Sequence, residues 1–164
     1  MRIIGIDPGL TKTGVGIIDV KNNSIFFVMS ETIYTKASDP FASRLHHFHE
    51  SLTAIIRTYQ PTQSAIEEVF INSNPASSLK LGHARGALIL SLKLGGLDVA
   101  EYSTTAVKKA VVGIGRAEKD QVQMMVKVLL PGANFKTEDE ADALAVAICH
   151  NNHYGFKNLK FIKS

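Results

Sequence analysis

The chain has 164 residues, 45% of them hydrophobic and 20% charged, which fits one globular domain. Cys149 is the single cysteine, so an intrachain disulfide is excluded and a reducing, cytoplasmic location is expected. No apolar run approaches the ~20 residues of a membrane span, and Asp7 interrupts the N-terminal apolar stretch too early for a signal peptide. A net charge of +3 is compatible with a nucleic-acid partner.

Three strands are predicted at the start of the chain. Residues 2–6 are β-branched and apolar, and Pro8-Gly9 ends that run. Residues 13–20 and 24–34 have the same character and are separated by a turn at residues 21–23. Because the connections are short, we expect an antiparallel meander.

From residue 41 the apolar side chains recur with the period of a helix, which is expected to run as far as Tyr59. A strand is expected at 63–67, then a helix from Asn74-Pro75 to about Leu94, and a further strand at 98–102. Three helices are expected after that. The first is short, is capped by Thr104 or Thr105 and ends near Gly113; the second ends at Pro131; the last begins at Thr137. This order predicts an α/β fold: a mixed five-stranded sheet, three antiparallel strands and then parallel ones, with helices on both faces. One domain is expected over residues 1–154, followed by a basic, partly disordered tail at residues 155–164.

Two acids each end a predicted apolar strand. Asp7 follows the first strand and Glu67 ends the fourth. Functional sites of open α/β sheets lie outside the carboxyl ends of parallel strands. A lone acid at such a position is usually a turn or cap residue, but two of them favour a shared site.

More acids gather at the start of the last helix. Thr137 and Glu140 fit a capping box, which accounts for Glu140. Asp142 lies beyond the cap, just before an apolar run, and it shares a helix face with either Asp139 or Glu138. Spacing alone does not choose between those two.

Carboxylates gathered in one cleft repel and desolvate one another, which raises their pKa values, and divalent cations relieve that repulsion. An all-oxygen donor set favours Mg²⁺, with Mn²⁺ as a substitute, over zinc. Two such ions per site can activate water for phosphodiester hydrolysis. The histidines offer no strong alternative, since His46, His47 and His49 are expected on a solvated helix face and late-helix His150 and His153 commonly complement the dipole.

Basic residues bracket a glycine-rich loop: Lys108, Lys109, Arg116 and Lys119 surround Gly113-Ile114-Gly115. Glycines there permit close approach to phosphate, and the cations add affinity by counterion release. A solvated loop is an equally good interpretation. Phe70, just beyond Glu67, is either an aromatic that stacks on an unpaired base or a core residue.

Six stretches together resemble the RuvC family of Holliday junction resolvases, within the ribonuclease H-like superfamily. They are residues 5–9 (GIDPG), 65–70 (AIEEVF), 79–86 (LKLGHARG), 107–115 (VKKAVVGIG), 117–119 (AEK) and 139–145 (DEADALA). The resemblance implies a ribonuclease H-like fold and a metal-dependent endonuclease that resolves four-way junctions in recombination and repair. Glu68 stands where some relatives carry a neutral amide, and strand alternation is expected to point it away from the site.

The resemblance also implies residue roles. Asp7, Glu67, Asp139 and Asp142 are the expected metal-binding catalytic acids, Lys108 and Lys119 the expected DNA contacts, and Phe70 the aromatic at the crossover. The expected partners are four-way junction DNA, a second copy in a homodimer, and a hexameric branch-migration motor with its junction-binding subunit. Symmetric cutting calls for a two-fold axis. The helix over residues 74–94 is expected at the dimer contact, because Ala84, Gly86 and Ala87 leave room for close packing.

Three other functions compete with this one. A junction-binding module without catalysis is opposed by the complete set of acids. A different ribonuclease H-like enzyme, such as an RNA–DNA hybrid nuclease, is opposed by the Gly-Ile-Gly loop with its lysines. An actin- or Hsp70-like phosphatase is opposed by length, because 164 residues are too few for the two lobes that clamp ATP.

Overall fold

The computed structural model describes residues 1–69 and 74–161, with side-chain surroundings as far as Tyr154. Its elements are β1 (Arg2–Asp7), β2 (Lys12–Lys21), β3 (Ser24–Tyr34), α1 (Phe41–Tyr59), β4 (Gln63–Glu67), α2 (Pro75–Leu94), β5 (Val99–Tyr102), α3 (Thr104–Val112), α4 (Lys119–Leu129) and α5 (Glu138–Phe161). The predicted element order is confirmed. Among the described residues, no helix is both long and apolar enough to cross a membrane.

The sheet has five strands in the order β3-β2-β1-β4-β5. β1, β2 and β3 pair antiparallel, whereas β1–β4 and β4–β5 pair parallel. Asn22 and Asn23 make the β2–β3 hairpin possible, because both take positive φ values of 50° and 62°. The parallel pairs need longer crossovers, which α1 and α2 supply.

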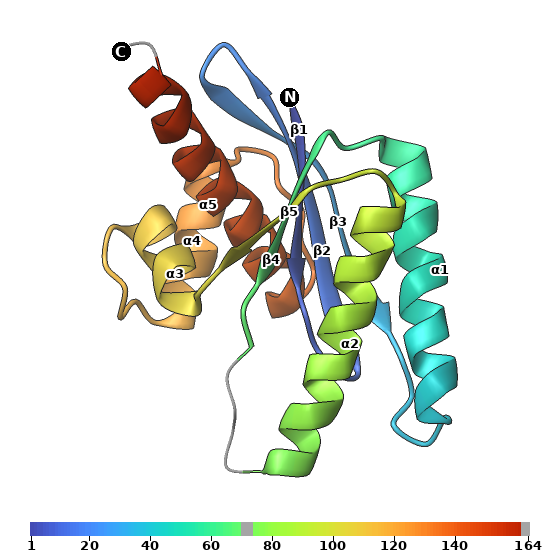
Figure 1. The fold of residues 1–164 in the computed structure, drawn as a ribbon. Coiled ribbons are helices and arrows are strands. Elements are labelled where there is room, and N and C mark those ends of the chain that lie inside the picture. Colours follow the sequence, from blue (N-terminus) through green and yellow to red (C-terminus); the bar gives the residue numbers. More distant parts are fainter. Residues whose placement is uncertain (70–73, 162–164) are drawn as a thin grey trace.

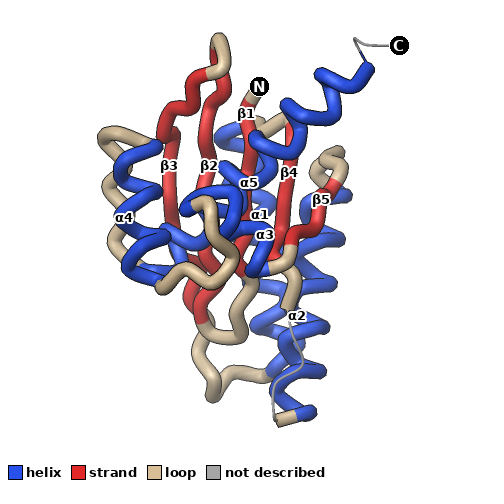
Figure 2. Tube along the Cα trace, turned by 90° about the vertical axis from the view of Figure 1, so that its left-hand side faces the viewer, coloured by secondary structure: helices blue, strands red, loops and turns tan. Residues whose placement is uncertain are grey.

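Helices cover both faces of the sheet, as Figures 1 and 2 show. α3, α4 and α5 lie on one face, where Ile3 and Ile18 are fully buried. α1 and α2 cover the other face, where Ile4 and Ile17 are fully buried. The apolar run of β1 has no polar alternation because this central strand is buried on both sides.

Helix ends show where the sequence interpretation holds and where it fails. Asn74 caps α2, and its side chain accepts from the backbone N–H groups of Ala76 and Ser77. The predicted cap of α3 was wrong, because Ser103 is the N-cap and Thr104 is already the first helical residue. Ser103 Oγ accepts from Ala106 N at 3.3 Å, which leaves the Thr104 hydroxyl available for another partner.

α5 extends past residue 154, the predicted end of the domain. It runs from Glu138 to Phe161, so it enters the segment expected to be a tail, and the boundary at 154 stays a prediction. His150 therefore lies well inside the helix. Its ring contacts the Tyr102 hydroxyl at 3.0 Å and Gln63 Oε1 at 3.3 Å, and it is buried, so the expected dipole role is wrong.

Candidate active site

Asp7 and Glu67 lie at the same edge of the sheet. Ile6 pairs with Ile66 in the parallel β1–β4 ladder, so the next residues of the two strands emerge side by side. Both acids line one cavity of about 250 Å³, together with Asp142 from α5. Two of the predicted acids, each at the end of a strand, thus lie together, and the last helix brings a third.

Glycines in β1 and β2 allow α5 to lie directly on the sheet. Gly14 is the register partner of Asp7, and a Cβ atom there would be 1.9 Å from the Asp139 carbonyl oxygen. A Cβ atom at Gly5 would be 2.2 Å from the Ala143 carbonyl oxygen. Only residues without a side chain permit this approach. Asp139 is consequently held next to the strand pair that carries Asp7.

Burial and mutual repulsion make the acids difficult to ionise. The pKa of Asp7 is raised to about 8, first by burial and then by the charges of Glu67, Asp142 and Asp139. Burial is also the largest cause of the raised pKa values of Glu67 and Asp142. Both repulsion and desolvation were predicted from the clustering of acids, and desolvation is the larger cause for all three groups.

The geometry favours Asp139 over Glu138 as the second acid from α5 near Asp7. Glu138 is exposed and pairs with Lys119, whose Nζ lies 3.2 Å from Glu138 Oε2. Its charge raises the pKa of Asp142, but only Asp139 of the two acts on Asp7. Asp139 does not line the cavity itself.

Glu140 has a structural role, although not quite the predicted one. Thr137 Oγ1 accepts from Glu140 N at 3.2 Å, as a capping residue does. The buried Glu140 carboxylate accepts from Lys136 N and from the Ser30 hydroxyl. It therefore ties the start of α5 to β3, in place of the reciprocal bond to Thr137 that a capping box would have.

The donor set fits a hard divalent cation. The carboxylates of Asp7, Glu67 and Asp142 offer only oxygen atoms, which such ions prefer. As placed in the described part of the chain, no three His, Cys, Asp or Glu side chains are close enough to hold an ion together. Coordination by three carboxylates would therefore require shorter distances between these side chains than the structure has.

Two of the predicted DNA contacts lie at the acids. Lys108 and Lys119 line the same cavity. Gly113 ends α3 with a φ of +86°, a conformation that favours glycine, and Gly115 packs against Thr105, 2.6 Å from where its Cβ would be. The local structure thus favours glycine at both positions. Arg116 is exposed beside them. Phe70 lies outside the described residues.

The sequence interpretation missed Thr104. Its hydroxyl donates to Glu67 Oε1, and it lines the cavity beside the acids. A threonine after a strand is typically a helix cap. Thr104 was therefore predicted as a cap, and its contact with Glu67 was not predicted. Glu68 is exposed and does not line the cavity.

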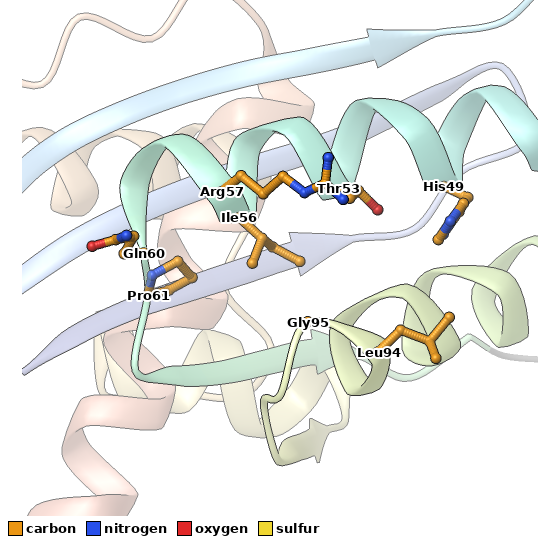
Figure 3. A pocket seen from close by; sticks show the side chains of 8 residues that line it. All are labelled: His49, Thr53, Ile56, Arg57, Gln60, Pro61, Leu94 and Gly95. Atoms are coloured by element: carbon orange, nitrogen blue, oxygen red, sulfur yellow. The ribbon is translucent and has the colours of Figure 1, made fainter.

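A second, larger cavity of about 530 Å³ lies between α1 and the end of α2, as Figure 3 shows. His49, Arg57 and Leu94 are among its lining residues, and none of the lining residues is acidic. Pro61 places it near the start of β4, whereas Glu67 ends that strand. It is therefore separate from the carboxylate site.

Comparison with known proteins decides the family. The family model described as crossover junction endodeoxyribonuclease RuvC matches residues 3–150. The chain belongs to the RuvC family. Curated RuvC proteins of this description include one from Brucella anthropi, 51% identical over 93% of this chain and 89% of the relative. Another, from Rhizobium rhizogenes, is 49% identical over 98% of this chain and 94% of the relative.

Solved structures agree with the RuvC assignment. Thermus thermophilus RuvC in complex with Holliday junction substrate is 30% identical, with a TM-score of 0.89 and 96% of each chain covered. A second structure of Thermus thermophilus RuvC has a TM-score of 0.85 at 29% identity, covering 96% of this chain and 97% of that one. The yeast mitochondrial resolvase Ydc2, 13% identical, shares the fold at a TM-score of 0.65 over 97% of this chain and 83% of that one. The predicted ribonuclease H-like resolvase fold is confirmed.

Proposed function

We propose that this chain resolves four-way DNA junctions during recombination and repair, by symmetric metal-dependent hydrolysis at Asp7, Glu67, Asp139 and Asp142. One observation carries the proposal: acids from β1, β4 and α5 meet two lysines around one cavity in a RuvC-family fold. The family supplies the reaction class, a crossover junction endodeoxyribonuclease. The described side chains supply a cavity suited to a cation and a phosphodiester together.

The acids are proposed to hold Mg²⁺, with Mn²⁺ as a substitute and two ions per site. Bound there, the ions would polarise the phosphodiester and activate water for attack. Burial and repulsion raise the pKa values of Asp7, Glu67 and Asp142, so their ionised forms are costly in the fold. Bound cations would therefore stabilise the cleft most when these groups are ionised.

Lys108 and Lys119 are the proposed phosphate contacts, because both line the cavity that holds the acids. Gly113, Gly115 and Arg116 extend that contact surface along the loop after α3. Phe70 keeps its proposed role at the crossover. These groups would hold the cleaved strand while the acids act on its phosphate.

The active form is proposed to be a homodimer in the cytoplasm, because two equivalent cuts need two sites related by a two-fold axis. The α2 outer face, our name for one exposed stripe of that helix, is the proposed contact. Its residues are Leu79, Gly82, His83, Gly86, Leu90 and Leu94. Side chains at Gly82 and Gly86 would meet open space, so a second helix can approach. Ala84, expected at this contact, is instead buried in the chain's own core. A hexameric branch-migration motor and its junction-binding subunit are the proposed loading partners.

Cleavage of matched substrates tests the function. Wild-type protein in Mg²⁺ is expected to cut a synthetic four-way junction symmetrically, and to leave a linear duplex and an RNA–DNA hybrid intact. Asp7→Asn, Glu67→Gln, Asp139→Asn and Asp142→Asn should each bind the junction without cutting it. Affinity should persist because it comes mainly from phosphate contacts. An amide variant that cuts at the wild-type rate would remove that residue from the site, and preferential cutting of the hybrid would overturn the substrate.

A further inference from the structure

We propose that Thr104 is a positioning residue that holds the Glu67 carboxylate in place for the cation. The inference rests on the proposed function. Its starting point is one contact: the Thr104 hydroxyl donates a hydrogen bond to Glu67 Oε1. The two residues come from different elements, α3 and β4, so the bond joins the strand that carries the acid to a neighbouring helix.

The hydroxyl is not needed to cap its own helix. Ser103 already does so, since its Oγ accepts from Ala106 N. Thr104 is the first helical residue, and Val107 and Lys108 follow three and four positions later on the same face. All three line the cavity beside the acids. α3 therefore presents this face to the site, with the Thr104 hydroxyl nearest Glu67.

The backbone of Glu67 is fixed independently of Thr104. Arg85 Nε on α2 donates to the Glu67 carbonyl oxygen at 2.9 Å, and the strand pairs with Tyr102 of β5. What remains free is the orientation of the side chain. A donor on Oε1 selects one orientation and leaves Oε2 for another ligand. Loss of a hydrogen bond to a side chain that binds a metal commonly lowers metal affinity or activity by about 10–100-fold.

Three variants separate the hydroxyl from the methyl group and from general damage to α3. Thr104→Val keeps the shape and removes the hydroxyl, whereas Thr104→Ser keeps the hydroxyl and removes the methyl group. Thr105→Val is the matched control, because Thr105 is the exposed neighbour on the same helix and does not line the cavity. Each protein is titrated with Mg²⁺ in the absence of DNA while its melting temperature is followed. Junction cleavage is then measured at saturating Mg²⁺.

Thr104→Val is expected to raise the Mg²⁺ concentration at the midpoint of the thermal shift by about tenfold or more. Thr104→Ser and Thr105→Val should stay within about threefold of wild type, on the same scale of effects. An unchanged midpoint for Thr104→Val would overturn the proposal, as would a Ser variant as impaired as Val. Asp7→Asn is measured in parallel. If its Mg²⁺ response equals that of wild type, the metal site itself is wrong, which is a different failure from that of Thr104.

Discussion

Gly14 of β2 lies against the backbone of Asp139 so closely that a Cβ atom on it would be 1.9 Å from the Asp139 carbonyl oxygen. Gly14 also pairs with Asp7 across the β1–β2 ladder. A residue with no functional group therefore sets how near the first turn of α5 comes to the central strand. The position of Asp139 therefore depends on the missing side chain at Gly14, the residue that pairs with Asp7.

Gly14→Ala is the first prediction that follows. The added methyl group would meet backbone atoms, which cannot rotate away as a side chain can, so α5 must shift. We expect a loss of stability of about 1–3 kcal/mol, the usual cost of overpacking, and loss of cleavage beyond what that destabilisation explains. Urea unfolding and junction cleavage below the melting temperature measure the two effects.

Gly132→Ala is the control for Gly14→Ala. Gly132 has a φ of +89° and open space around its Cβ position, so alanine there is strained but displaces nothing. It should lose roughly 1 kcal/mol of stability while cutting normally. Normal cutting by Gly14→Ala at equal destabilisation would contradict the role given to this contact.

The second prediction concerns pH. The pKa of Asp7 is about 8 in the fold against an ordinary value of 3.8, so between these values the folded state binds more protons than the unfolded state. Stability from this group is therefore present at low pH and is lost as pH rises through that window. In EDTA, Asp7→Asn should melt above wild type, with a gap that widens by up to about 1.4 kcal/mol for each pH unit between pH 5 and pH 8. Asp39→Asn, an exposed acid in a loop, should show no such trend.

Magnesium supplies the third prediction. An ion that binds only the folded form should stabilise wild type by about 2.7 kcal/mol at a hundred times its dissociation constant. Asp7→Asn should respond much less, because it lacks one ligand of the proposed site. The melting temperature is followed to tens of millimolar Mg²⁺, with sodium chloride matching ionic strength and Ca²⁺ as a comparison. Equal shifts in both proteins would mean that Asp7 does not take part in cation binding.

The fourth prediction concerns phosphate contacts. Lys108→Ala and Lys119→Ala should each weaken junction binding and reduce the slope of log affinity against log salt by about one. Lys109→Ala, exposed on α3 and absent from the cavity lining, should change the slope less. Glu138→Gln frees Lys119 from its exposed ion pair, so binding should tighten by about 2–5-fold, in line with the small worth of such pairs. Unchanged slopes for both cavity lysines would place the DNA elsewhere.

The fifth prediction concerns the α2 outer face. Leu90 is 58% exposed there, so Leu90→Asp should fold normally and yet sediment as a monomer that no longer makes paired cuts. Val128→Asp on α4 replaces an apolar residue that is 62% exposed and should stay dimeric. A wild-type protein that is monomeric at tens of micromolar, with and without junction DNA, would reject the dimer.

The strands and helices were predictable because their signals are local. Apolar runs, Pro8-Gly9 and Asn74-Pro75 each act within a few residues, and the structure has the expected elements in the expected order. Asp7 and Glu67 could be paired as well, because a general rule links the ends of parallel strands to a common edge. Those inferences needed no knowledge of how distant segments pack.

The contacts that position the acids could not be predicted, because each joins distant segments. Gly14 and Asp139 are far apart in sequence, and nothing in Gly-Val-Gly shows that both glycines lie against the backbone of α5. Thr104 was misassigned because Ser103 and Thr104 both suit a helix start, and only tertiary packing gives the hydroxyl of one to Glu67. Helical spacing likewise left Glu138 and Asp139 equal until the docking of α5 gave them different neighbours.

The proposed acids come from opposite parts of the chain: Asp7 is in the first strand, whereas Asp139 and Asp142 are in the last helix. Ribosomes make proteins from the N-terminus, so the β1–β3 meander exists well before α5 has been synthesised. Until α5 docks on Gly5 and Gly14, a growing chain lacks half of the proposed catalytic set. A chain that stops before α5 is therefore expected to leave junctions uncut, because it lacks Asp139 and Asp142.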